Sequence, residues 1–302
     1  MTLTNLITLT ESSTGSSAVV SPVGASLMEL TLSGNKVIEQ AAAGRPELYA
    51  GVVMAPWSGR IASGKWIDES GTERTLSINE PARNNALHGL VYNKSFEVKK
   101  SAASSVELVI DIAPTDGYPH ALRLAVSYEL EDGQLYASFA VKNLSDTRAP
   151  FSIGFHPYFS TTWADAPLRL QVSAESVLEL NENMIATGKA KVSDADKDLR
   201  ASKALTEVKL DDDFTDLDFV HGIATTKLLT ASGGGLEVWQ EDVFKHTVIY
   251  TPDEFPTASG STAAIAIEPS SSEVNEFNTK QDLLVLSPGE TRSGSWGIRL
   301  VN

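Results

Sequence analysis

The stretch LRLAVSYELEDGQLYASFAV, residues 122–141, decides the fold class of this chain. Apolar side chains occupy every second position from Leu122 to Leu130 and again from Leu135 to Val141. A period of two is typical of strands that turn one face toward a core. Between the two runs lies Asp132-Gly133, a preferred pair for a tight hairpin turn. The stretch therefore predicts an antiparallel β-hairpin.

The same alternation recurs along most of the chain, whereas no sustained helical periodicity is visible. Further strands are predicted within residues 18–32, 47–57, 60–68, 106–112, 168–180, 225–229, 236–239, 246–250, 263–267, 283–286 and 293–300. The segments 47–57 and 60–68 are predicted to form a pair around a break at 56–59. Residues 181–213 are polar and weakly periodic, and we expect a long surface excursion there. The pattern predicts an all-β fold of packed antiparallel sheets, as a single domain over residues 1–302.

Composition narrows the classes of partner. The 302 residues carry a net charge of −15 and no cysteine. The negative charge disfavours nucleic acid and anionic membranes and, more weakly, phosphorylated substrates. Without cysteine, neither disulfides nor thiolate chemistry is available. No basic-then-apolar leader and no apolar run of membrane length is present, so we expect a cytoplasmic protein.

His156 has the most constrained setting of any titratable side chain. It lies in FSIGFHPYF, residues 151–159, where Pro157 restricts it to extended conformations and Gly154 leaves space nearby. Tyr158 offers an aromatic face beside the imidazole. The segment fits either a site for a small polar ring or a packed histidine at a strand end.

His88 ends a second polar run, residues 79–89, in which Asn85 and its neighbours concentrate hydrogen-bond donors before Gly89. An ordinary polar loop is the alternative interpretation. The remaining histidines, His120, His221 and His246, have no such framing and are expected to be structural or solvated.

Glu268 ends the run AIAIE, residues 264–268. On a strand it shares a face with Ala264 and Ala266, while two isoleucines occupy the other face. Small side chains leading to an acid leave a hollow in which burial raises the carboxyl pKa, as a general base requires. An exposed edge-strand glutamate is the alternative.

Acidic residues also cluster at residues 210–216, and we expect a solvated loop there, with calcium binding as a weak alternative. A zinc site built from His88, His156 and Glu268 is disfavoured, because these residues come from distant segments without ligand spacing.

Taken together, these segments resemble the aldose 1-epimerase (galactose mutarotase) family. The matching motifs follow the family's order: residues 55–61 with Gly-Arg-Ile, 79–89 ending in Leu-His-Gly, 154–158 with His-Pro-Tyr, 210–215, 250–252, 266–269 with Glu-Pro, 275–279 and 286–290. The chain departs from the family at Ser270-Ser271-Ser272-Glu273 and at Leu90. These departures leave the candidate acid and base in place but bear on sugar preference.

The resemblance implies a β-supersandwich that binds a free monosaccharide, such as glucose or galactose, and interconverts its α and β anomers without metal or cofactor. It implies Glu268 as general base, His156 as general acid and His88 as an assisting residue. Arg60 and Asp211 would bind sugar hydroxyls, although Asp212 or Asp213 could take that role. From the residues themselves, Asn85 and Tyr158 are added as substrate-binding candidates. Two alternatives are an epimerase of hexose 6-phosphates and a non-catalytic sugar-binding protein, and either a monomer or a homodimer fits.

Overall fold

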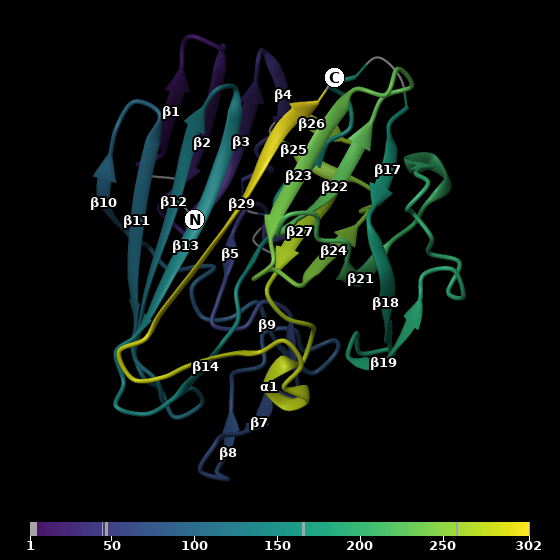
Figure 1. The fold of residues 1–302 in the computed structure, drawn as a ribbon. Helices are drawn as coiled ribbons and strands as arrows, with labels where there is room; N and C mark the ends of the chain where they lie inside the picture. Colours follow the sequence, from purple (N-terminus) through teal and green to yellow (C-terminus); the bar gives the residue numbers. More distant parts are fainter. Residues whose placement is uncertain (1–4, 44, 46–47, 165–166, 258, 302) are drawn as a thin grey trace.

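Two large antiparallel sheets and a smaller N-terminal sheet form the body of the molecule in the computed structural model (Figure 1), which describes residues 5–43, 45, 48–164, 167–257 and 259–301. None of the helices within these ranges is long and apolar enough to cross a membrane.

The larger sheet has nine strands within the described residues. Their order across the sheet is β10 (Glu97–Ser101), β11 (Ser105–Ile112), β12 (Leu122–Glu131), β13 (Gln134–Asn143), β29 (Thr291–Val301), β23 (Gly235–Glu241), β22 (Ile223–Leu229), β17 (Arg169–Val172) and β20 (Lys203–Ala204). The hairpin predicted from residues 122–141 is confirmed as β12 and β13, with Leu130 opposite Leu135. Asp132 and Gly133 both have positive φ values, as a two-residue hairpin turn of this kind requires.

The second sheet has eight strands in the described part of the chain. Their order is β19 (Ala186–Lys191), β18 (Ala174–Leu180), β21 (Asp211–Leu217), β24 (His246–Tyr250), β27 (Ala264–Ser270), β15 (Gly154–Phe155) and β5 (Val53–Met54), and β16 (Tyr158–Ser160) also pairs with β27. Every residue of β27 is buried, because it lies between β24 on one side and β15 and β16 on the other. The interpretation of Glu268 as an exposed edge residue is therefore wrong.

Shorter elements complete the fold. They are the N-terminal sheet of β1 (Ile7–Glu11), β2 (Ser16–Ser21), β3 (Ser26–Leu32) and β4 (Asn35–Ile38), the pairs β6 (Arg60–Ala62) with β9 (Asn85–Leu87), β7 (Lys65–Ile67) with β8 (Glu73–Thr75), β14 (Ala149–Phe151) with β28 (Leu284–Leu286), and β25 (Phe255–Thr257) with β26 (Gly260–Thr262), a 3₁₀ turn at Leu205–Glu207, and α1 (Glu276–Thr279).

Two local predictions are wrong. The segments 47–57 and 60–68 do not pair with each other, because β5 joins β15 in the large sheet and β6 joins β9; position 47 itself lies outside the described residues. The stretch 181–213 contains β19, β20 and the start of β21, so the acidic run 210–216 is largely a sheet strand rather than a solvated loop. Sheet pairing on both sides of β21 outweighs its polar composition.

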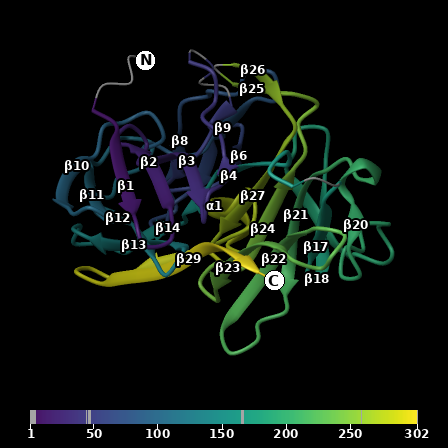
Figure 2. The same ribbon diagram turned by 90° about the horizontal axis from the view of Figure 1, so that it is seen from above.

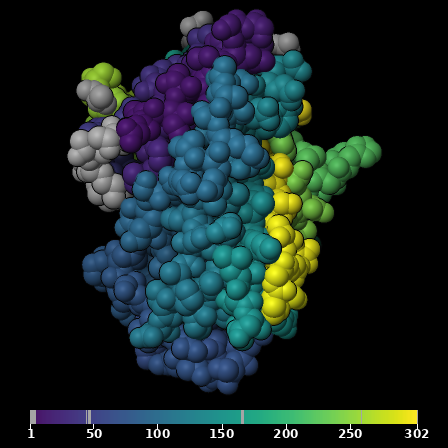
Figure 3. Space-filling model, turned by 90° about the vertical axis from the view of Figure 1, so that its left-hand side faces the viewer, coloured from purple at the N-terminus to yellow at the C-terminus, as the bar shows by residue number. Residues whose placement is uncertain are grey.

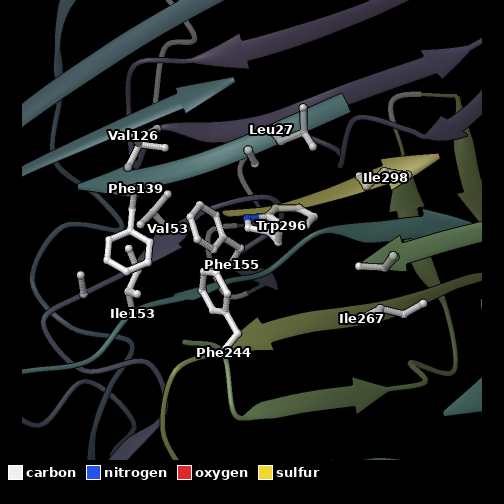
Figure 4. Close-up of a cluster of buried hydrophobic side chains, with 14 of the residues drawn as sticks. Leu27, Val53, Val126, Phe139, Ile153, Phe155, Phe244, Ile267, Trp296 and Ile298 are labelled. Atoms are coloured by element: carbon white, nitrogen blue, oxygen red, sulfur yellow. The ribbon is translucent and has the colours of Figure 1, made fainter. Parts of the chain in front are cut away.

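The core lies between the sheets (Figure 4). Trp296 of β29 packs on Phe155 of β15 with ring centroids 5.2 Å apart, and Phe139 of β13 packs on Phe244 at 5.7 Å. On the neighbouring half of the large sheet, the Tyr128 hydroxyl donates to the Ala25 carbonyl oxygen at 2.8 Å, which ties β12 to the N-terminal sheet. Viewed from above, β1–β4 lie beside β11–β13, while the eight-stranded sheet lies beside β22 and β23 (Figure 2). The opposite face of β10–β13 forms one side of the molecule, bordered by β29 (Figure 3).

Candidate active site

Three adjacent strands of the eight-stranded sheet form the floor of a pocket. Asp213 on β21 lies opposite Val248 on β24, and Val248 lies opposite Glu268 on β27. The next row places His246 opposite Ser270. Residues two apart on a strand share a face, so strand register brings side chains from distant parts of the chain to one surface.

The pocket contains about 500 Å³ of empty space, including its open mouth. Its lining comprises Met54, Ser58, Gly59, Arg60, His88, Leu180, Met184, Asp211, Asp212, Asp213, Val248, Glu268, Ser270, Ser272 and Val274. Gly154 lies beside this lining, where an added Cβ would come within 2.8 Å of Met54 Cε and 2.9 Å of Ser58 Cβ. A side chain at Gly154 would therefore displace the pocket wall.

Glu268 lines the pocket and pairs with His156, which lies beside the lining rather than in it. The Glu268 Oε1 and His156 Nε2 atoms are 3.4 Å apart, and both residues are almost completely buried. Burial, reinforced by the nearby Asp211 carboxylate, raises the pKa of Glu268 well above its usual range. Burial lowers the pKa of His156 to about 4. Both shifts favour the neutral form of each side chain, the state in which the pair holds a single transferable proton.

His88 lies perpendicular to His156, with ring centroids 5.4 Å apart. Its Nδ1 is 2.6 Å from the Ser58 carbonyl oxygen, and because a carbonyl oxygen only accepts, Nδ1 carries the hydrogen. Burial lowers the pKa of His88 well below its usual value, so Nε2 is an acceptor. His88 has a φ of 59°, and Gly89 follows at 77°, where a Cβ would lie 2.0 Å from the Ala55 carbonyl oxygen. This turn requires glycine and holds His88 in a strained conformation.

Glu80 organises the polar groups beside His88. It accepts two hydrogen bonds from Arg60, from Nε at 2.9 Å and Nη2 at 3.0 Å, and others from Arg83 and Asn85. Although burial opposes it, these donors hold the pKa of Glu80 below its usual range. The second amide hydrogen of Asn85 goes to the Asn183 carbonyl oxygen at 2.9 Å. Asn85 is thus engaged with protein groups and is not among the lining residues, while Arg60 reaches the lining.

The three consecutive aspartates of β21 have different settings. Asp212 pairs with Lys197 at 2.9 Å. Asp211 lines the pocket at its exposed edge, where partial desolvation raises its pKa against the opposing effect of Arg60. Asp213 is 5 % exposed and its Oδ1 lies 2.8 Å from His246 Nδ1.

Tyr158 lies behind His156 rather than in the pocket wall. Its ring stacks on the imidazole at 5.0 Å and on Phe255 at 4.6 Å, and it is 3 % exposed. The apolar part of the lining comes instead from Met54, Leu180, Met184, Val248 and Val274, which the sequence analysis did not single out. No motif marks these residues, because their only shared property is a common surface in the folded chain.

His246, expected from the sequence to be structural or solvated, is buried beside the pocket. It is 1 % exposed, with Nδ1 facing Asp213 and Nε2 lying 3.2 Å from Asp282 Oδ2. Burial opposes its protonation, but the two carboxylates raise its pKa to about 10. His246 is therefore a buried imidazolium beside the pocket.

A second layer of hydrogen bonds supports the wall at Ser58. The Ser58 N–H donates to Ser152 Oγ at 3.1 Å and to Glu276 Oε1 at 3.3 Å, and the Ser58 hydroxyl bonds that of Ser270 at 2.7 Å. Ser272, in contrast, is a lining residue whose hydroxyl is buried without a hydrogen-bond partner. Among the described residues, no three His, Asp or Glu side chains are arranged as a metal site.

Comparison with known proteins places this arrangement in a family context. The family model described as aldose 1-epimerase matches residues 5–299. An uncharacterized Escherichia coli protein, YihR, is 29% identical over 279 residues, which are 90% of this chain and 86% of that protein. Human galactose mutarotase is 29% identical over 148 residues, which are 46% of this chain and 42% of that enzyme.

Solved structures show the same fold. An aldose epimerase homologue from Caenorhabditis elegans superposes with a TM-score of 0.82 at 21% identity, covering 99% of both chains. A galactose 1-epimerase from Lactobacillus acidophilus superposes with a TM-score of 0.78 at 21% identity, covering 98% of this chain and 93% of that one. The predicted all-β fold of the galactose mutarotase type is thereby confirmed.

Proposed function

Because the chain belongs to the aldose 1-epimerase family, we propose that it interconverts the α and β anomers of a free hexose such as glucose or galactose. The observation that carries the proposal is the buried Glu268–His156 pair, with 3.4 Å between Oε1 and Nε2. In a cyclic hemiacetal, the anomeric hydroxyl and the ring oxygen are bonded to the same carbon. An acid and a base that serve both atoms must therefore lie close together, as these two groups do.

The reaction requires two coupled proton transfers. The Glu268 carboxylate takes the proton of the C1 hydroxyl while His156 delivers one to the ring oxygen, and the C1–ring oxygen bond breaks to give the open aldehyde. Rotation about C1–C2 presents the other carbonyl face, and reclosure reverses both transfers. Each transfer contributes roughly 10²- to 10⁴-fold to the rate.

The two pKa shifts suit these roles. A raised carboxyl pKa makes the Glu268 carboxylate the stronger base, and a pKa of about 4 makes protonated His156 the stronger acid. The single proton of the pair therefore passes readily between substrate and either side chain. Burial in a water-poor floor keeps that proton within the pair and the sugar.

Three of the remaining predicted residues, His88, Arg60 and Asp211, contact the sugar. His88 presents Nε2 toward the pocket, with its tautomer set by the Ser58 carbonyl oxygen. Arg60, fixed by Glu80 through Nε and Nη2, offers its remaining guanidinium hydrogens, and Asp211 accepts from a hydroxyl. We assign Asn85 and Tyr158 supporting parts, through Glu80 and through the back of His156 respectively.

A free sugar fits the pocket better than a phosphorylated one. Among the described lining residues, Asp212 and Asp213 are offset by Lys197 and His246, and Arg60 is already paired with Glu80, so no free cation faces a phosphate. The Asp211 carboxylate has no such cation beside it in these residues. A phosphate dianion entering this pocket would meet net repulsion.

The test is anomer exchange measured by polarimetry on freshly dissolved α-D-glucose and α-D-galactose, with a chelator present. We expect the protein to accelerate the approach to the unchanged final rotation, and the ratio of the two rates to identify the better sugar. Glucose 6-phosphate serves as the control substrate. Acceleration with the phosphate alone would support the phosphosugar alternative, and binding without acceleration would support a sugar-binding protein.

A further inference from the structure

At the end of the pocket floor opposite Glu268, Asp213 and His246 form a second carboxylate–histidine pair. The proposed reaction does not use this pair. We propose that Asp213 is a hydroxyl-binding residue of the pocket, and that the His246 imidazolium behind it holds this acceptor in place, so that the pair selects sugars by the hydroxyl that reaches it. This inference rests on the proposed function, because it concerns the substrate of the same site.

Strand register sets the distance between the two ends of the floor. Asp213, Val248 and Glu268 form one row across three neighbouring strands. Two strand spacings separate the outer members, about 10 Å between backbones. A sugar ring with its anomeric carbon at Glu268 therefore extends along the row toward Asp213, and Val248 lies beneath its C–H face.

One carboxylate oxygen of Asp213 is available to bind such a ligand. In the described contacts, its Oδ1 faces His246 at 2.8 Å, while Oδ2 takes no hydrogen bond. The side chain is 5 % exposed and lines the cavity. Its neighbours on the same strand differ, since Asp212 is paired with Lys197 and Asp216 with Lys189.

His246 makes the acceptor rigid. Its ring is almost completely buried and is held from both sides, by Asp213 at Nδ1 and by Asp282 at Nε2. An imidazolium fixed in this way prevents the Asp213 carboxylate from rotating away from the pocket. A pre-organised acceptor loses little entropy when a ligand binds.

An independent observation also favours a polar ligand in this pocket. Ser272 is 1 % exposed and is one of the residues that line the same cavity, and its buried hydroxyl has no hydrogen-bond partner. A buried hydroxyl without a partner is costly unless a ligand or water completes it. The pocket thus offers a sugar both an unused donor and an unused acceptor beyond the Glu268–His156 pair.

The experiment compares binding of the parent hexose and its 2-, 3-, 4- and 6-deoxy derivatives by titration calorimetry, with anomer exchange followed by NMR on the same samples. The proteins are the wild type, Asp213→Asn, His246→Asn and, as a matched control on the same strand, Asp216→Asn. His246→Asn keeps an N–H donor toward Asp213 but removes the positive charge, and the melting temperature of each variant reports its folding.

We expect Asp213→Asn to weaken binding of the parent sugar about 10-fold or more, the usual effect of losing a hydrogen bond to a charged group. For one deoxy sugar the wild type and Asp213→Asn bind equally, because the hydroxyl that contacts Asp213 is missing. His246→Asn shows the same selectivity with a smaller loss, and Asp216→Asn behaves like the wild type.

The proposal would be overturned if Asp213→Asn bound every sugar as tightly as the wild type does. It would also be overturned if the variant lost the same affinity for every sugar, because a purely structural pair does not distinguish one hydroxyl from the others. If the wild type exchanges anomers and this pattern is absent, the specificity proposal alone fails. If the wild type neither binds nor exchanges any sugar of the panel, the proposed function fails with it.

Discussion

Two buried histidines beside the pocket each face a carboxylate, yet their pKa values move in opposite directions. The pKa of His156, 3.4 Å from Glu268, falls to about 4. The pKa of His246, 2.8 Å from Asp213, rises to about 10. Two similar residue pairs, one on β21 and β24 and the other between β27 and the connection from β15 to β16, thus reach different protonation states.

The number of carboxylates around each ring explains the difference. His246 is held between Asp213 and Asp282, and two close anions outweigh the cost of burying its charge. His156 has a single carboxylate partner at a longer distance, and Glu268 itself favours its neutral form because burial, reinforced by the nearby Asp211, raises its pKa. One pair therefore suits proton transfer, which needs two accessible states, and the other suits a fixed charge.

Among the tests of this comparison, Glu268→Gln should have the largest effect, a loss of the anomer-exchange rate. The amide preserves shape but cannot accept the proton of the C1 hydroxyl, so the exchange rate should fall roughly 10²- to 10⁴-fold while sugar binding survives. Anomer exchange by NMR gives the rate, and calorimetry gives the binding constant.

Glu273→Gln is the matched control, since this half-buried carboxyl lies five residues further on and does not line the pocket. It should keep a rate near that of the wild type. Wild-type turnover in Glu268→Gln would remove Glu268 as the base and direct attention to Glu273 or to the aspartates at 211–213.

The sequence predicted the Glu268–His156 pair but not the Asp213–His246 pair. The run at residues 264–268 predicted that Glu268 borders a hollow, and Glu268 lines the pocket, but Ala264 and Ala266 pack against aromatic side chains instead of leading into it. The alternation of β12 and β13 predicted the class of fold. The family resemblance supplied His156 as the partner of Glu268. Each of these signals is local, because a strand period or a short motif is contained within a few residues.

His246 carries no comparable signal. Its partners Asp213 and Asp282 lie 33 and 36 residues away, and the pair forms only because β21 and β24 are neighbours in the sheet. The same pairing made the acidic run of β21 a sheet strand with a buried centre rather than the predicted loop. Strand order, which local patterns do not specify, decides both outcomes.

The second largest effect should appear in the pH dependence of kcat/KM. The active pair holds one proton, and it loses its base when a second proton binds His156, whose pKa is about 4. We expect kcat/KM to stay constant from pH 7 to about pH 5 and to fall by half near pH 4. A histidine with an ordinary pKa would place this limb near pH 6.5.

Exchange rates in a buffer series measure the limb, and circular dichroism at each pH checks that the protein stays folded. The residual activity of His156→Asn should lack the limb. A wild-type midpoint near pH 6.5 would contradict the neutral His156 on which the mechanism depends.

The smallest effect concerns stability at alkaline pH. The pKa of His246 is raised on folding, so its contribution to the free energy of unfolding is fully present below pH 6.5 and is lost as pH rises toward about 10. Across this window the native state binds the extra proton, and one proton gives a slope of at most about 1.4 kcal/mol per pH unit. The free energies of unfolding of the wild type and of His246→Asn, measured by urea denaturation, should therefore differ most near pH 6.5 and converge near pH 10.

Subtracting the value of the variant from that of the wild type removes the contributions of other groups, including Glu268, whose raised pKa acts in the same direction. A constant difference across the window would mean that His246 is neutral when folded, and the contrast between the two pairs would then disappear.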